Sequence, residues 1–312
     1  MADHRTRSGS LQYYPRKRVR KILPSVNWGN IEARSDAKGF LGLIGYKVGM
    51  VSVYAKDMTE DSMTKSKRVV IPGTILECPV MKIYCVRFHK YKQIVKDIVV
   101  TNEKDLKRKV KVCKTIKDFD KEVPEDYDDV SVIVYSVNKT KKPDMVELGI
   151  GGGKEDKLKL VKEKIGKDIL VSDVLQEGLV DVRGTTKGKG LQGPVKRFGI
   201  TLKAKKSEKG QRRPGSLAPW NPARVTFRAP QAGQLGMFSR TAHNNIILKI
   251  GKISEKDINK KSGFHKYGTI KNDYIILKGS VPGPRKRVLL LTKSFRGSRR
   301  TAKQNFEVVE LR

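Results

Sequence analysis

The sequence predicts a mainly β protein with some α structure, in which a barrel of short antiparallel strands carries one insertion and one long basic extension. Three observations support this fold class. Residues 41–100 and 171–312 contain repeated β-branched runs separated by Gly and Pro, without regular helical crossovers. Residues 101–170 are almost neutral, with 17 Lys and Arg against 15 Asp and Glu. Residues 181–240 are strongly basic, with fourteen Lys and Arg against two acids.

The net charge restricts the class of partner. The 312 residues carry a formal net charge of +35, and 38% of them are hydrophobic. Such a charge opposes compaction unless a polyanion neutralises it. No apolar run approaches the roughly 20 residues that a membrane-spanning helix needs, and the basic N-terminus lacks the apolar region of a signal peptide. We therefore expect a cytoplasmic protein bound to a polyanion, with no membrane partner.

The cysteines and histidines predict neither disulfides nor a metal site. Cys78, Cys85 and Cys113 are odd in number and have no CxxC spacing, so we expect reduced thiols. Cys85 and His89 are close in sequence, but two ligands do not make a zinc site. We expect no cofactor, apart from Mg²⁺ ions held by the polyanion itself.

Residues 1–40 read as a basic N-terminal extension. Tyr13, Tyr14 and Trp28 alternate with basic residues, and no helix or strand period is present. A solvated disordered tail is one interpretation. Aromatic rings beside arginines favour a segment that becomes ordered on RNA by stacking and phosphate contacts. The candidate RNA-binding residues in this arm are Arg16, Lys17 and Arg18.

The barrel strands are expected wherever an apolar run lies between turn residues. Residues 39–54 have the Gly-punctuated pattern of two strands joined by a tight turn. Pro79 separates the next two β-branched runs. The further expected strands are residues 69–76, 81–89, 94–101, 178–184, 246–250, 273–279 and 287–292.

The near-neutral segment 101–170 is expected to be an α/β insertion on the outer side of the barrel, facing solvent and not the polyanion. Residues 102–110 and 156–167 have helical patterns, and residues 130–137 form a clear buried strand. We also expect a short capped helix at residues 171–175.

The glycines of residues 148–154 invite comparison with a phosphate-binding loop. That motif requires Gly, four residues, then Gly-Lys-Ser/Thr. Leu148 stands where the first Gly is required, and Glu155 follows Gly153-Lys154. The mismatches favour a flexible loop after a strand.

Residues 184–245 are expected to be a central extension emitted from the barrel. Its Arg side chains have almost no acids nearby, so their partner is expected to be external and anionic. Lys-Gly steps at residues 187–190 are expected to let backbone N–H groups approach phosphates. The candidate RNA-binding residues here are Lys187, Lys189, Arg212, Arg213, Trp220, Arg224, Arg228 and Arg240.

The aromatic residues of the extension leave alternatives open. Trp220 suits stacking on a base, because Pro219 and Pro222 argue against a barrel-core position for it. Phe227 and Phe238 fit the core and the RNA surface equally well. Beyond the extension, a stiff basic turn at residues 281–287 adds three candidates: Arg285, Lys286 and Arg287.

Several sequence blocks succeed one another along nearly the whole chain. They are His4-Arg5 with Pro15 to Arg18, Gly39 to Met50, Val182 to Gly190, Ala218 to Val225, Ala232 to Gly236, Ser239 to Thr241, and Pro282 to Val288. In these blocks the sequence resembles the universal large-subunit ribosomal protein L3 family, in its archaeal and eukaryotic form. The insertion at residues 101–170 carries no matching motif.

The resemblance implies a six-stranded, translation-factor-like barrel on the surface of the large ribosomal subunit. It also implies that residues 184–245 penetrate ribosomal RNA towards the peptidyl-transferase centre, with Trp220 in the tip loop nearest to it. The family acts early in subunit assembly and contacts the 3′ region of large-subunit RNA and neighbouring ribosomal proteins.

Two positions depart from the eukaryotic pattern. Asn221 follows the Trp where eukaryotic members carry His, and Phe238 stands where many relatives carry His. The sequence therefore looks more like the archaeal branch and gives no support to a histidine-dependent modification of the tip.

Two other classes of function fit the sequence less well. An RNA-modifying enzyme needs clustered His, Asp, Glu or Cys residues, whereas Asp181 and Glu208 of the basic half are far apart in sequence. A DNA-packaging or transcription protein would show a helix-turn-helix, zinc or zipper pattern. We therefore expect a non-enzymatic ribosomal protein that binds ribosomal RNA.

Overall fold

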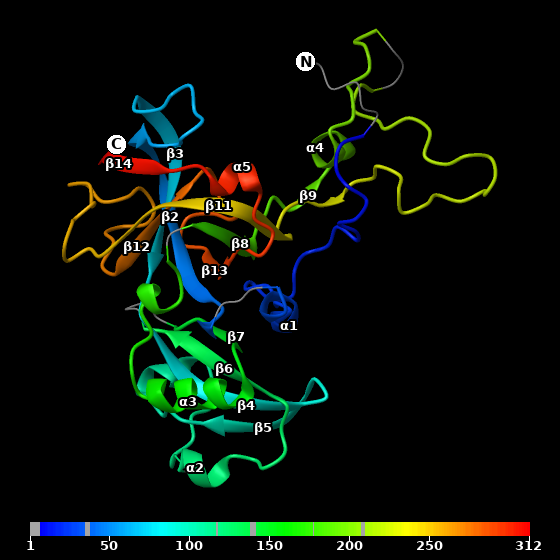
Figure 1. Ribbon diagram of the computed structural model, residues 1–312. Helices are drawn as coiled ribbons and strands as arrows, with labels where there is room; N and C mark the ends of the chain where they lie inside the picture. Colours follow the sequence, from blue (N-terminus) through cyan, green and yellow to red (C-terminus); the bar gives the residue numbers. More distant parts are fainter. Residues whose placement is uncertain (1–6, 35–37, 117, 138–141, 177, 207–209) are drawn as a thin grey trace. The chain divides into compact units, whose positions relative to one another are not determined.

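The computed structural model confirms a mainly β protein, in which strands predominate over short helices (Figure 1). The chain divides into two compact units, each of which is described by itself. Unit 1 comprises residues 1–22 and 185–240, and unit 2 comprises residues 23–184 and 241–312. The structure describes residues 7–34, 38–116, 118–137, 142–176, 178–206 and 210–312. His4, Arg5 and Glu208, which entered the sequence argument, lie outside these ranges.

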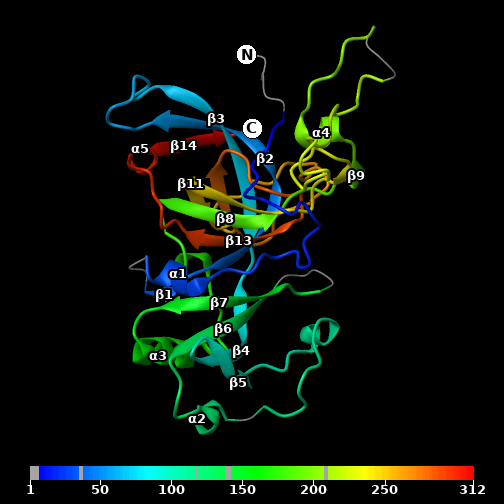
Figure 2. The ribbon, with the colours of Figure 1, turned by 90° about the vertical axis from the view of Figure 1, so that its right-hand side faces the viewer.

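The larger sheet of unit 2 has seven strands in the order β13-β8-β11-β12-β3-β2-β14. Figure 2 shows β8 between β11 and β13. The strand bounds are β2 Leu43–Asp57, β3 Arg68–Cys78, β8 Leu179–Thr185, β11 Ser239–Gly251, β12 Asp273–Lys278, β13 Val288–Lys293 and β14 Phe306–Leu311.

Strand β2 is long enough to share one edge between two partners. Its first residues pair with β13, Leu43 opposite Leu291 and Tyr46 opposite Val288. Its last residues pair with β14, where Asp57 lies opposite Phe306. Because β13 also pairs with β8, the pairings among β13, β8, β11, β12, β3 and β2 return to their starting strand, and β14 is added outside this ring.

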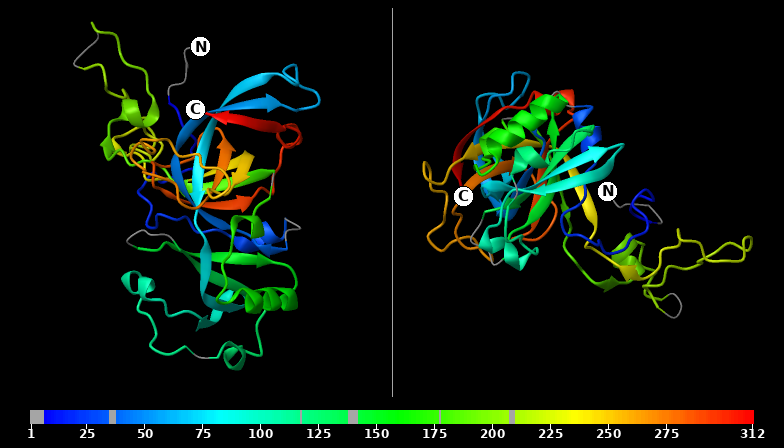
Figure 3. Two further views of the ribbon diagram at one scale, coloured as in Figure 1. Left: turned by 90° about the vertical axis from the view of Figure 1, so that its left-hand side faces the viewer. Right: turned by 90° about the horizontal axis from the view of Figure 1, so that it is seen from below.

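The smaller sheet of unit 2 has five strands in the order β1-β7-β6-β4-β5. Helix α3 (Lys154–Lys164) crosses one face of it (Figure 3). The side chain of Lys157 reaches Glu32 at 2.5 Å and Asp129 at 2.7 Å. Its strand bounds are β1 Gly39–Phe40, β4 Met81–Lys90, β5 Gln93–Val99, β6 Asp129–Ser136 and β7 Met145–Gly151.

The expected boundary of the insertion at residue 101 is wrong. Strands β4 and β5 were assigned to the barrel, but β4 pairs with β6 and β5, so the second sheet begins at Met81. Only Pro79 and Val80 separate β3 from β4. The reason is that an apolar run predicts a strand without specifying its partner. One core cluster contains Leu43 and Leu290 of the larger sheet with Met81 and Val132 of the smaller one.

The Gly-rich segment 148–154 is not the flexible loop that we expected, because β7 extends through Gly151. Leu148 and Ile150 are buried. The glycines allow close packing, since a Cβ on Gly149 would lie 2.6 Å from the Cβ of Trp28. Trp28, expected in an RNA-binding arm, packs instead on the core of unit 2 from helix α1 (Trp28–Glu32).

The remaining helices of unit 2 are short. The helix expected at residues 102–110 is only a 3-10 helix at Lys104–Arg108, whereas the one expected at 156–167 is α3. The other helical segments are α2 Phe119–Glu122, a 3-10 helix at Val171–Asp173, and α5 Arg299–Ala302. No helix in the ranges that the structure describes is long and apolar enough to cross a membrane.

Unit 1 contains little regular structure. Strands β9 (Leu191–Gln192) and β10 (Gly233–Gln234) pair with each other, and helix α4 spans Pro194–Phe198. Pro194 occupies the first turn of α4, and Gly199 ends it with a left-handed φ of 63°. Between α4 and β10 the chain has no helix or strand among its described residues (Figure 1).

Candidate nucleic-acid interface

The described residues of unit 1 carry positive charge without a carboxylate to balance it. The described residues of this unit include no Asp or Glu, and every ion pair found in the described part of the chain lies in unit 2. Guanidinium and ammonium groups without acids nearby are available to an external anion. The exposed candidates of unit 1 are Lys17, Arg18, Lys187, Lys189, Arg212, Arg213, Arg224 and Arg228.

Trp220 lies on the surface, with 97% of its area exposed. This excludes the core position that was the alternative for it. Phe227 is also exposed, at 67%, and its ring meets that of Tyr14 edge-on at 5.6 Å. An exposed Trp between two prolines can offer a whole aromatic face to a base.

Arg197 on α4 joins three separate stretches of unit 1. Its Nε donates to the carbonyl of Gln234 at 3.0 Å. Its Nη1 donates to the carbonyl of Gln231 at 3.0 Å, and its Nη2 to that of Arg16 at 3.2 Å. In the opposite direction, Arg16 Nη1 donates to the carbonyl of Arg197 at 2.6 Å. These bonds attach the N-terminal arm to the extension.

Phe198 is the aromatic centre of the same arrangement. Its ring is buried, with 1% of its area exposed. The guanidinium carbons of Arg16, Arg7 and Arg197 lie 4.2, 4.7 and 5.0 Å from the ring centre. Contacts of this kind contribute about 0.5–2 kcal/mol each. Arg16 is therefore half-buried inside unit 1, and its expected contact with RNA stays a prediction.

Electrostatic crowding accompanies this packing. Burial lowers the pKa of the Arg16 guanidinium. The nearby charges of Arg197, Arg7 and Arg240 lower it further, against an opposing effect of Tyr14. A phosphate near this cluster would relieve the repulsion among its guanidinium groups.

One backbone N–H of the Lys-Gly steps after β8 is bonded within the chain, and the phosphate contacts expected of the others stay a prediction. The backbone N–H of Lys189 donates to the carbonyl of Leu235 at 2.9 Å and is not left for a phosphate. Gly236 has a φ of 78°, and a Cβ there would lie 1.9 Å from the carbonyl oxygen of Lys187. The glycine therefore permits close approach of two chain segments, while Lys187 and Lys189 keep exposed side chains.

The basic turn at residues 281–287 lies in unit 2 and is fixed by a buried lysine. Lys47 Nζ donates to the carbonyls of Val281 at 2.6 Å and Gly283 at 3.2 Å. The turn leaves Arg285 and Lys286 exposed. Arg287 is half-buried, and burial lowers the pKa of its guanidinium.

The sequence argument missed the residues that hold unit 1 together, which are Arg7, Arg197 and Phe198. A signal was present, because Pro194 and Gly199 bracket a five-residue helix in the way that helix starts and ends are marked. A sequence does not show, however, that a guanidinium binds carbonyls instead of phosphates.

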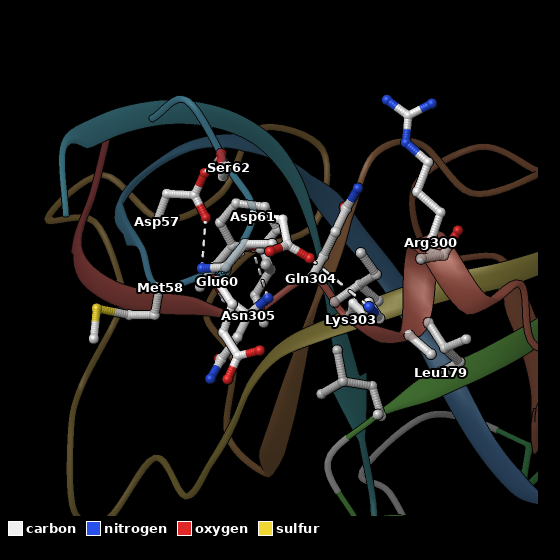
Figure 4. Close-up of a pocket in the computed structure, with 18 of the residues that line it drawn as sticks. Asp57, Met58, Glu60, Asp61, Ser62, Leu179, Arg300, Lys303, Gln304 and Asn305 are labelled. Carbon is white, nitrogen blue, oxygen red and sulfur yellow. Dashed lines mark hydrogen bonds and ion pairs between the residues drawn. The ribbon is translucent and has the colours of Figure 1, made fainter. Parts of the chain in front are cut away.

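A larger hollow, of about 1080 Å³, lies in unit 2 beside the β2–β3 loop and the segment from α5 to β14. Figure 4 shows Asp57, Glu60 and Asp61 around it. Asp57 accepts hydrogen bonds from the hydroxyls of Ser62 and Thr64, each at 2.6 Å. These bonds, led by Ser62, hold the pKa of Asp57 well below its ordinary value. The hollow is also lined by Arg300 and Lys303, so it has mixed charge and not the uniform positive charge of unit 1.

The described residues contain no group of three or more His, Cys, Asp or Glu side chains that could hold a metal ion. Cys78, Cys85 and Cys113 are free thiols. Burial raises the pKa of Cys85 to about 12, so this thiol stays protonated at neutral pH.

Comparison with known proteins gives a consistent result. A family described as "Ribosomal protein L3" matches residues 1–121 and 88–312. Three archaeal relatives carry the printed name "Large ribosomal subunit protein uL3". They come from Methanothermobacter thermautotrophicus at 42% identity, Archaeoglobus fulgidus at 40% and Methanosphaera stadtmanae at 39%, each alignment covering 95% of this chain and 93% of the relative.

Arg197→Lys should loosen the N-terminal arm. A lysine has one ammonium group and cannot reach three carbonyls in the fork geometry of a guanidinium. Losing one charge-assisted hydrogen bond of about 1.5 kcal/mol corresponds to about a tenfold change in docking. We expect about tenfold faster tryptic cleavage after Arg18 and Arg20, followed by mass spectrometry. Lys196→Arg, an exposed neighbour on α4, is the control. An unchanged cleavage rate in Arg197→Lys would refute this role.

Asp57→Asn should change the acid dependence of stability. The lowered folded-state pKa means that Asp57 stabilises the fold fully above its unfolded pKa and loses this effect as pH falls through the folded pKa. The variant should have a lower free energy of unfolding than wild type at pH 7, and this difference in free energy should become smaller below about pH 4. Urea denaturation at several pH values measures the difference. Asp61→Asn is the control, because that side chain is 83% exposed. A difference independent of pH would contradict the expectation.

Proposed function

The chain belongs to the ribosomal protein L3 family, and from this premise we propose that it is a structural constituent of the large ribosomal subunit that binds large-subunit RNA. The family is one of structural proteins, so the chain is not an enzyme. Its place is in the ribosome, in the cytoplasm, where neighbouring large-subunit proteins are further partners. It acts early in subunit assembly.

The observation that carries this proposal is that the described residues of unit 1 include no acid, a feature that unit 2 does not share. Acidic and basic side chains pair with each other in unit 2, whereas the described residues of unit 1 offer cations alone. Cations that neutralise phosphates release condensed counterions, which gives a large favourable term at moderate salt. Unit 1 is therefore one RNA-binding part of the molecule.

We propose finer assignments on the family resemblance. The ring of paired strands in unit 2 is the translation-factor-like barrel, and residues 184–245 are the extension that penetrates ribosomal RNA towards the peptidyl-transferase centre. The exposure of Trp220 supports its position at the tip, where it stacks on a base. The RNA contacted is mainly the 3′ region of the large-subunit RNA.

The candidate residues divide into two roles. The exposed lysines neutralise phosphate charge, and the exposed arginines add bidentate contacts and stacking that lysine does not make. Arg285 and Lys286 form a second, separate phosphate contact because Lys47 fixes the backbone of their turn. Mg²⁺ ions at the interface are ligands of the RNA, and the protein has no cofactor of its own.

Deletion of residues 205–230 should leave unit 2 folded and impair subunit maturation. The segment supplies none of the strands of unit 2, so the thermal unfolding of the purified variant should follow that of wild type. Sucrose-gradient analysis of cells that depend on the variant should show fewer mature large subunits. A second variant, in which Gly and Ser replace these residues at equal length, separates side-chain chemistry from connectivity. Normal subunit yield in both variants would exclude the penetrating extension.

Trp220→Ala should alter the RNA near the tip without unfolding the protein. Truncation of an exposed side chain usually changes stability by less than about 0.5 kcal/mol. Chemical probing of large-subunit RNA in variant subunits should show altered reactivity of bases in the peptidyl-transferase region. Leu217→Ala, in the same loop and 40% exposed, is the control. Identical base reactivity in the Trp220→Ala and wild-type subunits would argue against stacking.

A further inference from the structure

A second, smaller hollow lies wholly within unit 1, where the N-terminal arm passes the end of the extension. It has a volume of about 370 Å³ and is lined by residues 12–20 and 238–240. We call it the arm pocket. Ligand pockets span roughly 300–1,000 Å³, so this one suits a single small group.

The walls of the arm pocket combine aromatic rings with guanidinium groups. The guanidinium carbon of Arg240 lies 4.3 Å from the centre of the Tyr13 ring and 5.2 Å from that of Phe238. Tyr13 remains 55% exposed although a guanidinium covers part of it. Aromatic area is therefore available beside a planar cation.

Backbone hydrogen bonds connect the two sides of the arm pocket. The N–H of Val19 donates to the carbonyl of Met237 at 3.0 Å. Phe238 exchanges two bonds with Thr186, its N–H donating to the hydroxyl at 3.1 Å and its carbonyl accepting from the N–H at 2.9 Å. The pocket is thus formed before any ligand arrives, which reduces the entropy lost on binding.

The charge at the arm pocket favours an anion. Arg16 and Arg240 line it, Lys17, Arg18 and Arg20 join them from the arm, and the described residues of unit 1 contribute no carboxylate. Burial lowers the pKa of Arg16, and the neighbouring charges of Arg197, Arg7 and Arg240 lower it further. A group that carries negative charge and a flat apolar face matches both features.

We propose that the arm pocket receives one unstacked nucleotide of single-stranded RNA. Its base stacks on Tyr13, and its phosphate is held by the guanidinium groups of Arg16 and Arg240. This assignment rests on the proposed RNA-binding function and adds a defined subsite to it. A base inside a duplex offers no free face, so the pocket selects loops, bulges and ends.

The test compares two probes of equal charge, a ten-residue oligouridylate and a ten-residue abasic ribose-phosphate chain. Every protein is full-length and carries Trp220→Ala, which removes stacking at the tip. Fluorescence anisotropy at fixed salt gives the two affinities. We expect the parent protein to prefer oligouridylate about five- to tenfold, the effect of one stacked base. Tyr13→Leu should abolish this preference and leave binding of the abasic chain unchanged.

Two controls and a second variant complete the design. Tyr91→Leu makes the same chemical change at an 82% exposed tyrosine of unit 2 and should keep the preference. Arg240→Lys keeps the charge but loses the planar group that holds the phosphate, and should weaken binding of both probes severalfold. Arg68→Lys, at an exposed position of unit 2, should leave both affinities unchanged. Tryptic cleavage of the arm at the parent rate shows that the variants stay docked.

Photocrosslinking gives a readout that needs no variant. Oligouridylate containing 4-thiouridine should crosslink to the peptide that carries Tyr13 or to the one that carries Phe238. Crosslinks confined to other peptides, or a full preference retained by docked Tyr13→Leu, would overturn the arm pocket. Equal binding of both probes by the parent protein would also overturn the arm pocket, but it would not contradict the proposed RNA-binding function. Failure of the protein to bind either probe or large-subunit RNA would instead reject the proposed function.

Discussion

Guanidinium groups hold unit 1 together by binding backbone carbonyls and aromatic rings. Because these partners carry no negative charge, the unit keeps its positive charge. An ion pair with Asp or Glu would fix Arg197 equally well, but it would cancel a positive charge. A carbonyl accepts the hydrogen bond and leaves the charge in place. The three bonds of Arg197 and the three guanidinium groups around Phe198 therefore give order to a segment with almost no apolar core. The unit keeps the cations that a polyanion requires.

Unit 2 is held together differently, by an apolar core and by ion pairs between acidic and basic side chains. Its strands bury Leu289, Leu290 and Leu291 completely, and its acids pair with lysines and arginines, as Lys157 does with Asp129. Apolar burial at about 25 cal/mol per Å² stabilises this unit without help from a ligand. A self-sufficient scaffold and an ordered cationic segment thus share one chain. The protein can present its charge in a defined geometry because stability is generated elsewhere in the sequence.

The sequence was sufficient for the strands and for the basic extension, because both are properties of local composition. Continuous apolar runs predicted β6, β12 and β13 closely. The tight turn expected within residues 39–54 is wrong, because β2 runs without interruption from Leu43 to Asp57. Strand pairing could not be predicted from the sequence, since no feature of residues 81–99 indicates that β4 pairs with β6 and not with a strand of the larger sheet. The loop predicted around Gly149 was wrong for a related reason. In the sequence, a strand glycine that leaves space for the side chain of Trp28 cannot be told from a glycine in a loop. Exposure of Trp220 followed from its flanking prolines, whereas the internal role of Arg197 depends on carbonyls that only the fold brings together.

The divided edge of β2 has a consequence for synthesis. Its first residues pair with β13 and its last residues pair with β14. Both partner strands lie more than two hundred residues further along the chain. Contacts between residues so far apart in sequence form late, because the entropy of loop closure is lost before these contacts stabilise the chain. During translation the cationic residues of the extension leave the ribosome before Val288–Leu311 does. A nascent chain thus exposes an open sheet edge together with the cations of the extension, and this interval is when it is most vulnerable to aggregation. Prompt completion of the last two strands is what ends that exposure.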